Sequence, residues 1–202
     1  TPSPWTRCAG STTPPSPCPP SRPDTQAGPS AGRGAGANNT PATRPAEGQA
    51  WVSVLDVGQG LAVVVETAKR VLVYDVGARF SARFDAGERL VGPYVRWRGW
   101  DAVDRAVVSH ADNDHAGGLG GLNRVVRVRD LLGPDRRGLS PDLAARVSLD
   151  GVPRRTCRRG QAWAWSGVRF EVLHPGVDER WSRNDGSCVL RIRAGAVSYT
   201  HL

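Results

Sequence analysis

One stretch of the sequence, "VVSHADNDHAGGLGGL" from Val107 to Leu122, constrains the fold more than any other. A short apolar run, typical of a buried strand, leads directly into two histidines and two aspartates. Paired glycines follow at Gly117 and Gly118, and their lack of a Cβ lets the backbone pass close to neighbouring atoms. The pattern predicts a strand that brings four polar side chains to a sheet edge: His110, Asp112, Asp114 and His115.

These four side chains indicate a metal site. Imidazole and carboxylate groups are the ligands of zinc, manganese and iron in proteins. A bound divalent ion lowers the pKa of water and polarises a phosphoryl or carbonyl oxygen. The alternative is a polar loop that carries two histidines by chance. That alternative explains poorly why four ligand-type residues stand together between an apolar strand and paired glycines.

The rest of the chain predicts more strands than helices. Residues 61–77 are typical of a hairpin that turns around 67–70, and apolar spacing predicts a short helix within 86–100 with Pro93 in its first turn. Further strands are expected in the following segments: 51–60, 101–110, 124–134, 162–175 and 188–194. We therefore expect an α/β (α+β) fold, in which mixed sheets have one face covered by helices. No repeat of 20 to 50 residues is present.

The first 48 residues differ from the rest in composition. Of the 16 prolines in the chain, 11 lie before residue 46, among Ser, Thr, Gly and Ala. Such a segment has little apolar surface to bury. We expect a disordered segment over 1–48 and one folded domain over 49–202. No apolar run reaches the roughly 18 residues of a spanning helix, so we expect this part to be soluble.

The four cysteines form no C-x-x-C pair, which argues against a cysteine zinc site. Cys8 and Cys18 could form a disulfide in an oxidising compartment, and the sequence leaves this open.

The chain is basic, with 27 Lys and Arg against 19 Asp and Glu and a net charge of +8. A basic field concentrates phosphates, although an arginine-rich composition also arises from GC-rich coding. Arg127 and Arg129 alternate on a predicted strand, and they could guide a nucleic-acid backbone if their face borders the site. The alternative is that both arginines lie on an ordinary solvated surface.

Four tryptophans could stack on bases, with packing inside the fold as the alternative: Trp97, Trp100, Trp163 and Trp165.

The motif "SHADNDHAGGL" resembles the H-x-[HD]-x-D-H signature of the metallo-β-lactamase fold. The segments "LDVGQGLAVVVETAKRVLVYDVG", "FEVLHP" and "NDGSCVLRI" are similar to one branch of that fold, the ComEC-type competence proteins that carry DNA across the bacterial inner membrane. The resemblance covers about residues 50–195 and implies a partial αββα sandwich. In that branch the aspartate of a Gly-Asp pair and a histidine at the end of a later strand complete the metal site. We expect the chain to hold the first half of the domain, without those ligands.

The resemblance implies roles for individual residues. His110 and Asp112 are expected to bind one metal ion, and Asp114 and His115 a second, or Asp114 orients the attacking water. Many relatives have His at the position of Asp112, and this change makes Mn²⁺ as plausible as Zn²⁺ and one ion as plausible as two.

Two further aspartates are expected outside the ligand set. Asp75, at a strand end in "LVYDVG", is expected to hold a ligand histidine, with a simple turn residue as the alternative. Asp56 and Gln59 are expected at the same sheet edge, where turn formation is their alternative role. His174 precedes Pro175 at a strand end and is expected to be structural.

The implied function is metal-dependent phosphodiester hydrolysis in a DNA-uptake protein, on the outer side of the inner membrane. Its partners would be single- or double-stranded DNA and the membrane channel portion of the same parent chain. The fragment itself is expected to bind metal weakly and to be inactive. Two alternatives stay open: a stand-alone hydrolase of an ester, thioester or lactam, and a non-catalytic DNA-binding appendage.

Overall fold

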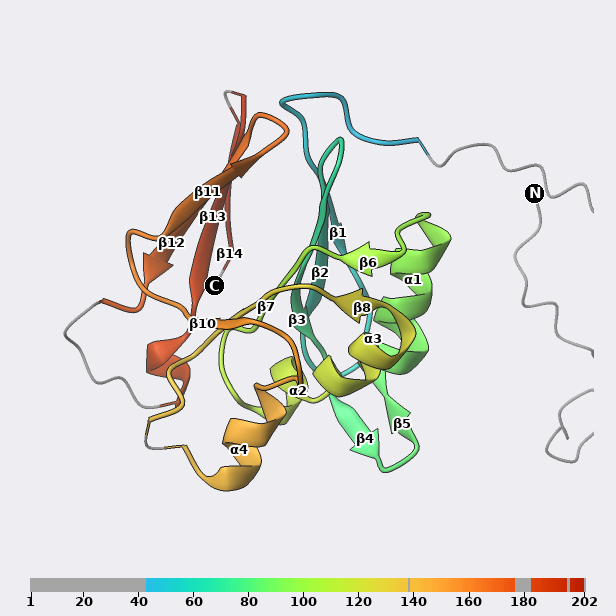
Figure 1. Ribbon diagram of the computed structural model, residues 1–202, viewed down its shortest axis with the longest axis vertical. Coiled ribbons are helices and arrows are strands. Elements are labelled where there is room, and N and C mark those ends of the chain that lie inside the picture. The colour runs from blue at the N-terminus through green and yellow to red at the C-terminus, as the bar shows by residue number, and fades with distance from the viewer. Residues whose placement is uncertain (1–42, 138, 177–182, 196, 202) are drawn as a thin grey trace, which may run out of the picture. The chain divides into compact units, whose positions relative to one another are not determined.

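The computed structural model describes residues 43–137, 139–176, 183–195 and 197–201. The described part has three layers: helices, a six-stranded mixed sheet and a four-stranded antiparallel sheet (Figure 1). The predicted α/β class, with a mixed sheet and few helices, is confirmed. Most of the segment predicted to be disordered, residues 1–42, lies outside the described residues. Residues 43–48 are described, and Arg44 among them donates a hydrogen bond of 2.7 Å to the carbonyl of Gly99.

The six-stranded sheet has the order β1-β2-β3-β7-β9-β10, and the four-stranded sheet the order β11-β12-β13-β14. The strands of the first are β1 (Trp51–Val54), β2 (Ala62–Glu66), β3 (Val71–Val76), β7 (Arg105–Val107), β9 (Leu131–Gly133) and β10 (Arg154–Thr156). Those of the second are β11 (Ala162–Trp165), β12 (Val168–His174), β13 (Val189–Ala194) and β14 (Val197–His201). Two small pairs are formed by β4 (Arg79–Ser81) with β5 (Phe84–Asp85), and by β6 (Ala102–Val103) with β8 (Arg127–Val128).

The helices are short. They are the π-helical turn η1 (Gly87–Val91), α1 (Gly92–Trp97), α2 (Asn113–Ala116), α3 (Leu119–Val125), α4 (Pro141–Arg146) and the 3₁₀ turn η2 (Arg183–Gly186). The predicted helix within 86–100 is confirmed, with Pro93 in the first turn of α1, where its missing N–H costs no helical hydrogen bond. Residues 113–116, within the polar motif, form a single helical turn.

Two apolar clusters hold the layers together. One lies between the helices and the six-stranded sheet and includes Val73, Leu119 and Leu122. The other fills the space between the sheets, where Tyr74 and Val107 meet Phe170 from β12. Strands of the first sheet therefore bury both faces, which explains why β2 and β3 are apolar at almost every position.

The predicted hairpin over 61–77 is confirmed. β2 and β3 pair antiparallel, and the turn closes with a hydrogen bond of 2.8 Å from the amide of Thr67 to the carbonyl of Arg70. β3 then pairs parallel with β7, with Tyr74 opposite Val107. The carboxyl ends of β3 and β7 consequently lie side by side, and this edge carries the polar motif.

Candidate metal centre

The polar motif follows β7 at the edge where β3 also ends. Asp75 lies at the end of β3, and Ser109 and His110 come directly after β7. The parallel pairing brings these segments together although they are more than 30 residues apart in the chain. All three residues are buried, with Asp75 at 0% and His110 at 6% exposure. A buried carboxylate of this kind requires several hydrogen-bond donors.

Asp75 receives those donors from the motif. Its Oδ1 accepts a hydrogen bond from the amide of Ser109 at 2.7 Å, and its Oδ2 accepts one from the Ser109 hydroxyl at 2.7 Å. The same Oδ2 is 2.7 Å from Nδ1 of His115. The backbone of Asp75 adopts φ 54°, a left-handed conformation that aspartate tolerates better than bulkier residues. The predicted link between Asp75 and a motif histidine is thus present in the structure.

The Ser109 hydroxyl extends the effect of Asp75 to the other histidine. Its Oγ is 2.9 Å from Nδ1 of His110. Because the Ser109 hydroxyl donates its single proton in a hydrogen bond to Asp75, Oγ accepts a hydrogen bond from His110 Nδ1–H, while His115 Nδ1–H donates to Asp75. Both rings are then protonated at Nδ1 and keep a lone pair at Nε2. Ser109 was not among the predicted site residues, and only its position directly before His110 in the sequence indicates this role.

The Nε2 atoms lie near the two exposed carboxylates. His110 Nε2 is 3.7 Å from Asp112 Oδ2, and His115 Nε2 is 3.6 Å from Asp114 Oδ2. Ligand atoms of His110, Asp114 and His115 all lie within 4.8 Å of one another. Two imidazoles with fixed tautomers and a carboxylate suit a divalent cation such as Zn²⁺ or Mn²⁺. Asp112 is not in this group of three, and its predicted role as a ligand stays a prediction.

Asp112 lies next to the group because of how α2 begins. It occupies the N-cap position with extended backbone, yet its side chain makes no capping hydrogen bond. Its carboxylate, 36% exposed, is therefore available to His110. If Asp112 served only to start the helix, its carboxylate would accept a hydrogen bond from a backbone amide in the first turn of α2.

The two histidines differ in their protonation behaviour in the metal-free chain. Burial, and next the neighbouring His115, lowers the pKa of His110 below its usual value despite the three nearby aspartates. Burial also acts to lower the pKa of His115, but the hydrogen bond and charge of Asp75, with the charges of Asp114 and Asp112, raise it overall. Asp75 therefore stabilises positive charge at His115, either a proton or a bound cation.

The "DVGQG" loop packs against the centre through its backbone. The amide of Leu61 donates to the carbonyl of Asp114 at 3.1 Å, and a Cβ on Gly60 would lie 2.0 Å from the same oxygen. The loop thus lies at the predicted sheet edge. The Asp56 carboxylate accepts from the amide of Gly58 at 3.0 Å, which is the turn-forming role. Its expected place among the residues that support the ligands stays a prediction.

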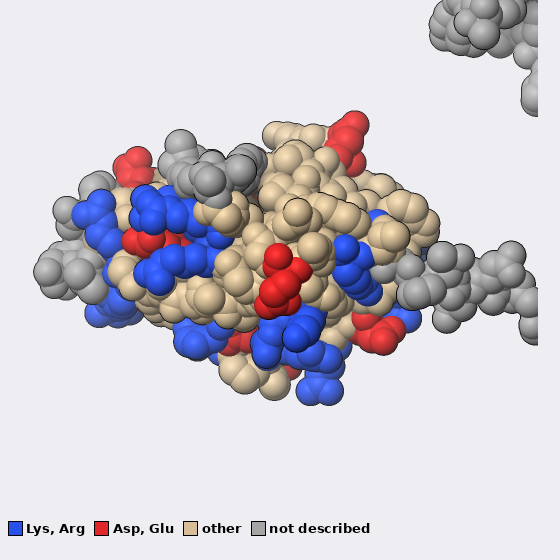
Figure 2. Space-filling view, turned by 90° about the horizontal axis from the view of Figure 1, so that it is seen from above, with Lys and Arg blue, Asp and Glu red and all other residues tan. Residues whose placement is uncertain are grey.

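Arg127 and Arg129 do not lie beside the centre. Arg127 is in β8, which pairs with β6, and Arg129 forms an ion pair of 2.9 Å with Asp104. Asp104 precedes β7, whereas the centre follows β7, so the structure does not bring these arginines together with the motif. On the face seen in Figure 2, basic side chains form separate groups with acidic side chains between them.

Of the four tryptophans considered for base stacking, three pack within the fold. Trp163 stacks on Phe170 with ring centroids 5.3 Å apart and joins the cluster between the sheets. Trp100 donates a hydrogen bond of 2.7 Å to the buried carboxylate of Glu66. Trp97 is the exception, at 74% exposure, and lies on α1.

A pocket of about 490 Å³ lies against the second sheet, next to the centre. It is lined by Arg159, Leu173, His174, Asn184, Asp185, Ser187 and Val189. Ser187 connects it to the centre, since its Oγ is 3.5 Å from His110 Nδ1. His174 Nδ1 donates to the carbonyl of Ser187 at 3.0 Å, in agreement with its expected structural role. The side chain of Arg159 donates through Nε to the carbonyl of Leu173 at 2.8 Å.

A disulfide joins Cys157 and Cys188. The sequence analysis considered only Cys8 and Cys18, which lie outside the described residues. No local spacing could have revealed the bond, because the two cysteines are 31 residues apart and meet only when the sheets pack.

No helix in the described residues is both long and apolar enough to cross a bilayer.

Comparison with solved structures supports the fold. A metallo-β-lactamase of Cronobacter sakazakii with a HARLDQ motif superposes with a TM-score of 0.53 at 18% identity, over 75% of this chain and 60% of that one. Two curated proteins are more similar in sequence. YcaI of Escherichia coli is 31% identical over 77% of this chain, and competence protein ComA of Neisseria gonorrhoeae is 34% identical over 75%. The chain spans 18% and 19% of their respective lengths.

The family model of the Metallo-beta-lactamase superfamily matches residues 55–200, which include the whole candidate centre. The likeness to a competence protein is consistent with the ComEC-type branch that the sequence motifs resemble. With the matched range, the layered fold and the His–Asp–His group in agreement, the chain belongs to the metallo-β-lactamase superfamily.

Proposed function

We propose that this chain is the hydrolytic domain of a DNA-uptake protein and that it cleaves phosphodiester bonds with the help of Zn²⁺ or Mn²⁺. The observation that carries the proposal is the group formed by His110, Asp114 and His115, whose two imidazoles are held at Nδ1 by Ser109 and Asp75. Such support keeps Nε2 available for a metal ion. The similarity to a competence protein favours DNA as the substrate.

Each residue of the centre has a distinct part in this proposal. One or two divalent cations, when bound, would make water more acidic and polarise the phosphoryl oxygen. His110 and His115 would hold the cation through Nε2. The Asp114 carboxylate is 40% exposed, so it can orient the attacking water and accept its proton. Asp75 stays buried and serves to position His115.

The pocket beside the centre is suited to a DNA phosphate. Among the described residues, the Nη atoms of Arg159 pair with no carboxylate. The Ser187 hydroxyl and the Asn184 amide line the same pocket, which Asp185 also borders. A guanidinium with neutral donors recognises phosphate oxygens. We therefore propose Arg159, in place of Arg127 and Arg129, as the arginine that contacts the substrate.

The test is a cleavage assay on the complete reading frame that contains this domain. End-labelled single- and double-stranded DNA should be cut in the presence of Mn²⁺ or Zn²⁺, and both chelator and Asp114→Ala should abolish cleavage. Asp142→Ala, at the start of α4, is a control that should leave the rate unchanged. Cleavage that survives chelator and Asp114→Ala would contradict the proposal. Hydrolysis of a lactam, ester or thioester without DNA cleavage would favour a stand-alone hydrolase.

A role in DNA uptake implies a cellular location for the domain and a partner within the same parent protein. We propose that the domain works on the outer side of the bacterial inner membrane, beside a membrane channel formed by the same parent chain. Reporter fusions at the domain boundary of the parent protein would test the side, and an enzyme reporter active only in the cytoplasm would contradict it. The inactivity of these 202 residues by themselves stays a prediction, to be tested in the same cleavage assay.

A further inference from the structure

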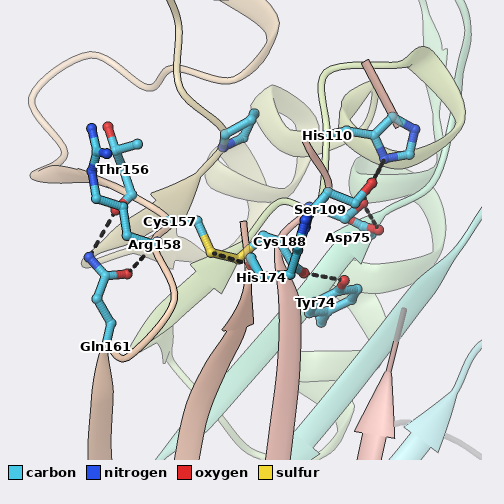
Figure 3. The surroundings of a disulfide bond; sticks show 12 residues. Tyr74, Asp75, Ser109, His110, Thr156, Cys157, Arg158, Gln161, His174 and Cys188 are labelled. Carbon is cyan, nitrogen blue, oxygen red and sulfur yellow. Dashed lines mark hydrogen bonds between the residues drawn. A yellow bond between two sulfur atoms is a disulfide. The ribbon is translucent and has the colours of Figure 1, made fainter. Parts of the chain in front are cut away.

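A disulfide link between the two sheets lies beside Ser109 and Asp75, which support the candidate centre (Figure 3). Cys157 follows β10 at one edge of the six-stranded sheet, and Cys188 precedes β13 in the four-stranded sheet. Both residues are fully buried, and their Cα atoms are 5.8 Å apart. The amide of Cys157 also donates to the carbonyl of Gly133 at 2.7 Å, so this end of the link is fixed to β9.

The other end of the link contacts the residues that hold the histidines. The amide of Cys188 donates to the carbonyl of Ser109 at 2.9 Å, and the carbonyl of Cys188 accepts a hydrogen bond of 2.7 Å from the Tyr74 hydroxyl. Burial raises the pKa of Tyr74 well above its usual range, so this hydroxyl remains a donor. Tyr74 and Ser109 are the neighbours of Asp75 and His110 in the chain. The amide and the carbonyl of Cys188 are thus both hydrogen-bonded to residues adjacent to Asp75 and His110.

The position of Cys188 also affects the imidazole of His110, because the Ser109 hydroxyl contacts that ring. It lies 2.9 Å from His110 Nδ1, and Ser187, next to Cys188, approaches the same nitrogen at 3.5 Å. A shift of residues 187–188 would therefore move two of the groups that set the orientation of the His110 ring. Small displacements of such supporting groups have large effects on metal affinity.

We propose that the Cys157–Cys188 disulfide is a positioning link for the centre: it holds residues 187–188 against Ser109 and thereby fixes His110 for metal binding. The inference rests on the proposed metal site. It further implies that the domain reaches full metal affinity only in an oxidising compartment, because cytoplasmic thiols are kept reduced. That requirement agrees with the proposed location on the outer side of the membrane.

The experiment uses the full chain with Cys8→Ser and Cys18→Ser, so that the buried pair is the only possible internal disulfide. Cys157→Ala in this background cuts the link but leaves the amide and carbonyl of residue 188 in place. Mn²⁺ is the probe, since it favours oxygen and nitrogen over a free thiolate. We expect the dissociation constant for Mn²⁺ to rise about tenfold, the lower end of the range for supporting groups, and the Cys188 amide to exchange hydrogen faster.

Gln161→Ala is the matched control. Gln161 hydrogen-bonds Thr156 and Arg158 on either side of Cys157 (Figure 3), so its loss perturbs the same loop without cutting the link. This variant should bind Mn²⁺ like the background. Should Cys157→Ala fail to fold, reduction and reoxidation of the background chain give the same comparison, and reoxidation should restore the affinity.

The possible outcomes separate the two proposals. Unchanged Mn²⁺ affinity and unchanged exchange at Cys188 in the cut chain would overturn the positioning role. Equal weakening by Gln161→Ala would also overturn it, because general loosening of the loop would then be sufficient. A third outcome is that the oxidised Cys8→Ser, Cys18→Ser chain binds no Mn²⁺, but hydrogen exchange at the Cys188 amide still becomes faster when the disulfide is removed. In that case the proposed metal-dependent function has failed, although the disulfide does hold residue 188 in place.

Discussion

Asp75 and Ser109 show how two side chains outside the ligand set decide the chemistry of the centre. One buried carboxylate accepts a hydrogen bond from His115 directly and acts on His110 through a serine hydroxyl. Both histidines then have the tautomer that a metal ion at Nε2 requires. The arrangement explains why the motif contains "SH" rather than an apolar residue before the first histidine.

The substitution Asp75→Asn tests this arrangement. Asparagine tolerates the left-handed backbone at this position, so the change acts on hydrogen bonding. If its oxygen keeps the Ser109 amide, its NH₂ faces His115 Nδ1 and donates, which moves the ring proton to Nε2. We expect Mn²⁺ affinity to fall by about 10–100-fold and the ¹⁵N shifts of His115 to report the other tautomer. Asp142→Asn, in the exposed first turn of α4, should change neither.

At the scale of elements, the centre depends on close backbone approach as much as on side chains. Gly60 has φ +121° and lies against the carbonyl of Asp114, and Gly118 lies against the carbonyl of Val76. The paired-glycine prediction is therefore confirmed at Gly118. The loop before β2 and the single turn of α2 are held together by the Leu61–Asp114 hydrogen bond.

Gly60→Ala should disturb both stability and the centre. The new methyl group would lie 2.0 Å from the Asp114 oxygen, at a φ that L-residues avoid. We expect a loss of about 2–4 kcal/mol in the free energy of unfolding from strain and clash, together with weaker Mn²⁺ binding. Gly151→Ala is the control, since Gly151 also has positive φ but no atom within 4 Å, and it should cost about 1 kcal/mol. Equal urea midpoints for Gly60→Ala and Gly151→Ala would contradict the predicted clash at Gly60.

A second prediction at this scale concerns Glu66, at the end of β2. Its side chain is 1% exposed, and it accepts from Arg98 Nε at 2.8 Å and from Trp100 Nε1 at 2.7 Å. Glu66→Gln keeps the shape of the side chain but leaves the half-buried Arg98 guanidinium without its charged partner, and should destabilise the fold by about 3 kcal/mol. Arg137→Ala breaks the exposed pair with Asp135 and should leave the urea midpoint almost unchanged. Urea unfolding of both variants checks the difference.

For the whole molecule, the helices, the mixed sheet and the antiparallel sheet together place the centre at one sheet edge, with the pocket of the second sheet beside it. The outer face of that second sheet is charged, and Arg191 there pairs with Glu171 at 2.6 Å. Only the assembled sheets bring Ser187 and the disulfide to the polar motif. Metal binding at the motif should therefore stabilise the whole domain.

Thermal unfolding with Mn²⁺ measures that coupling. A ligand at a hundredfold its dissociation constant stabilises the native state by about 2.7 kcal/mol. We expect the melting temperature of the chain to rise accordingly, and the double variant His110→Ala with His115→Ala to show no rise. The same rise in the double variant would mean that Mn²⁺ binds elsewhere.

The sequence by itself determined the class of site, because four ligand-type side chains within six residues, an apolar strand before them and glycines after them are all local features. It likewise predicted the hairpin of β2 and β3 and the link from Asp75 to a motif histidine. The tertiary structure alone decided the hydrogen bonds of Ser109, the pairing of Cys157 with Cys188 and which arginine lines the pocket beside the centre. These depend on strands that pair in parallel and on two sheets that pack face to face, and such contacts join residues 31 to 77 positions apart, which no local pattern specifies.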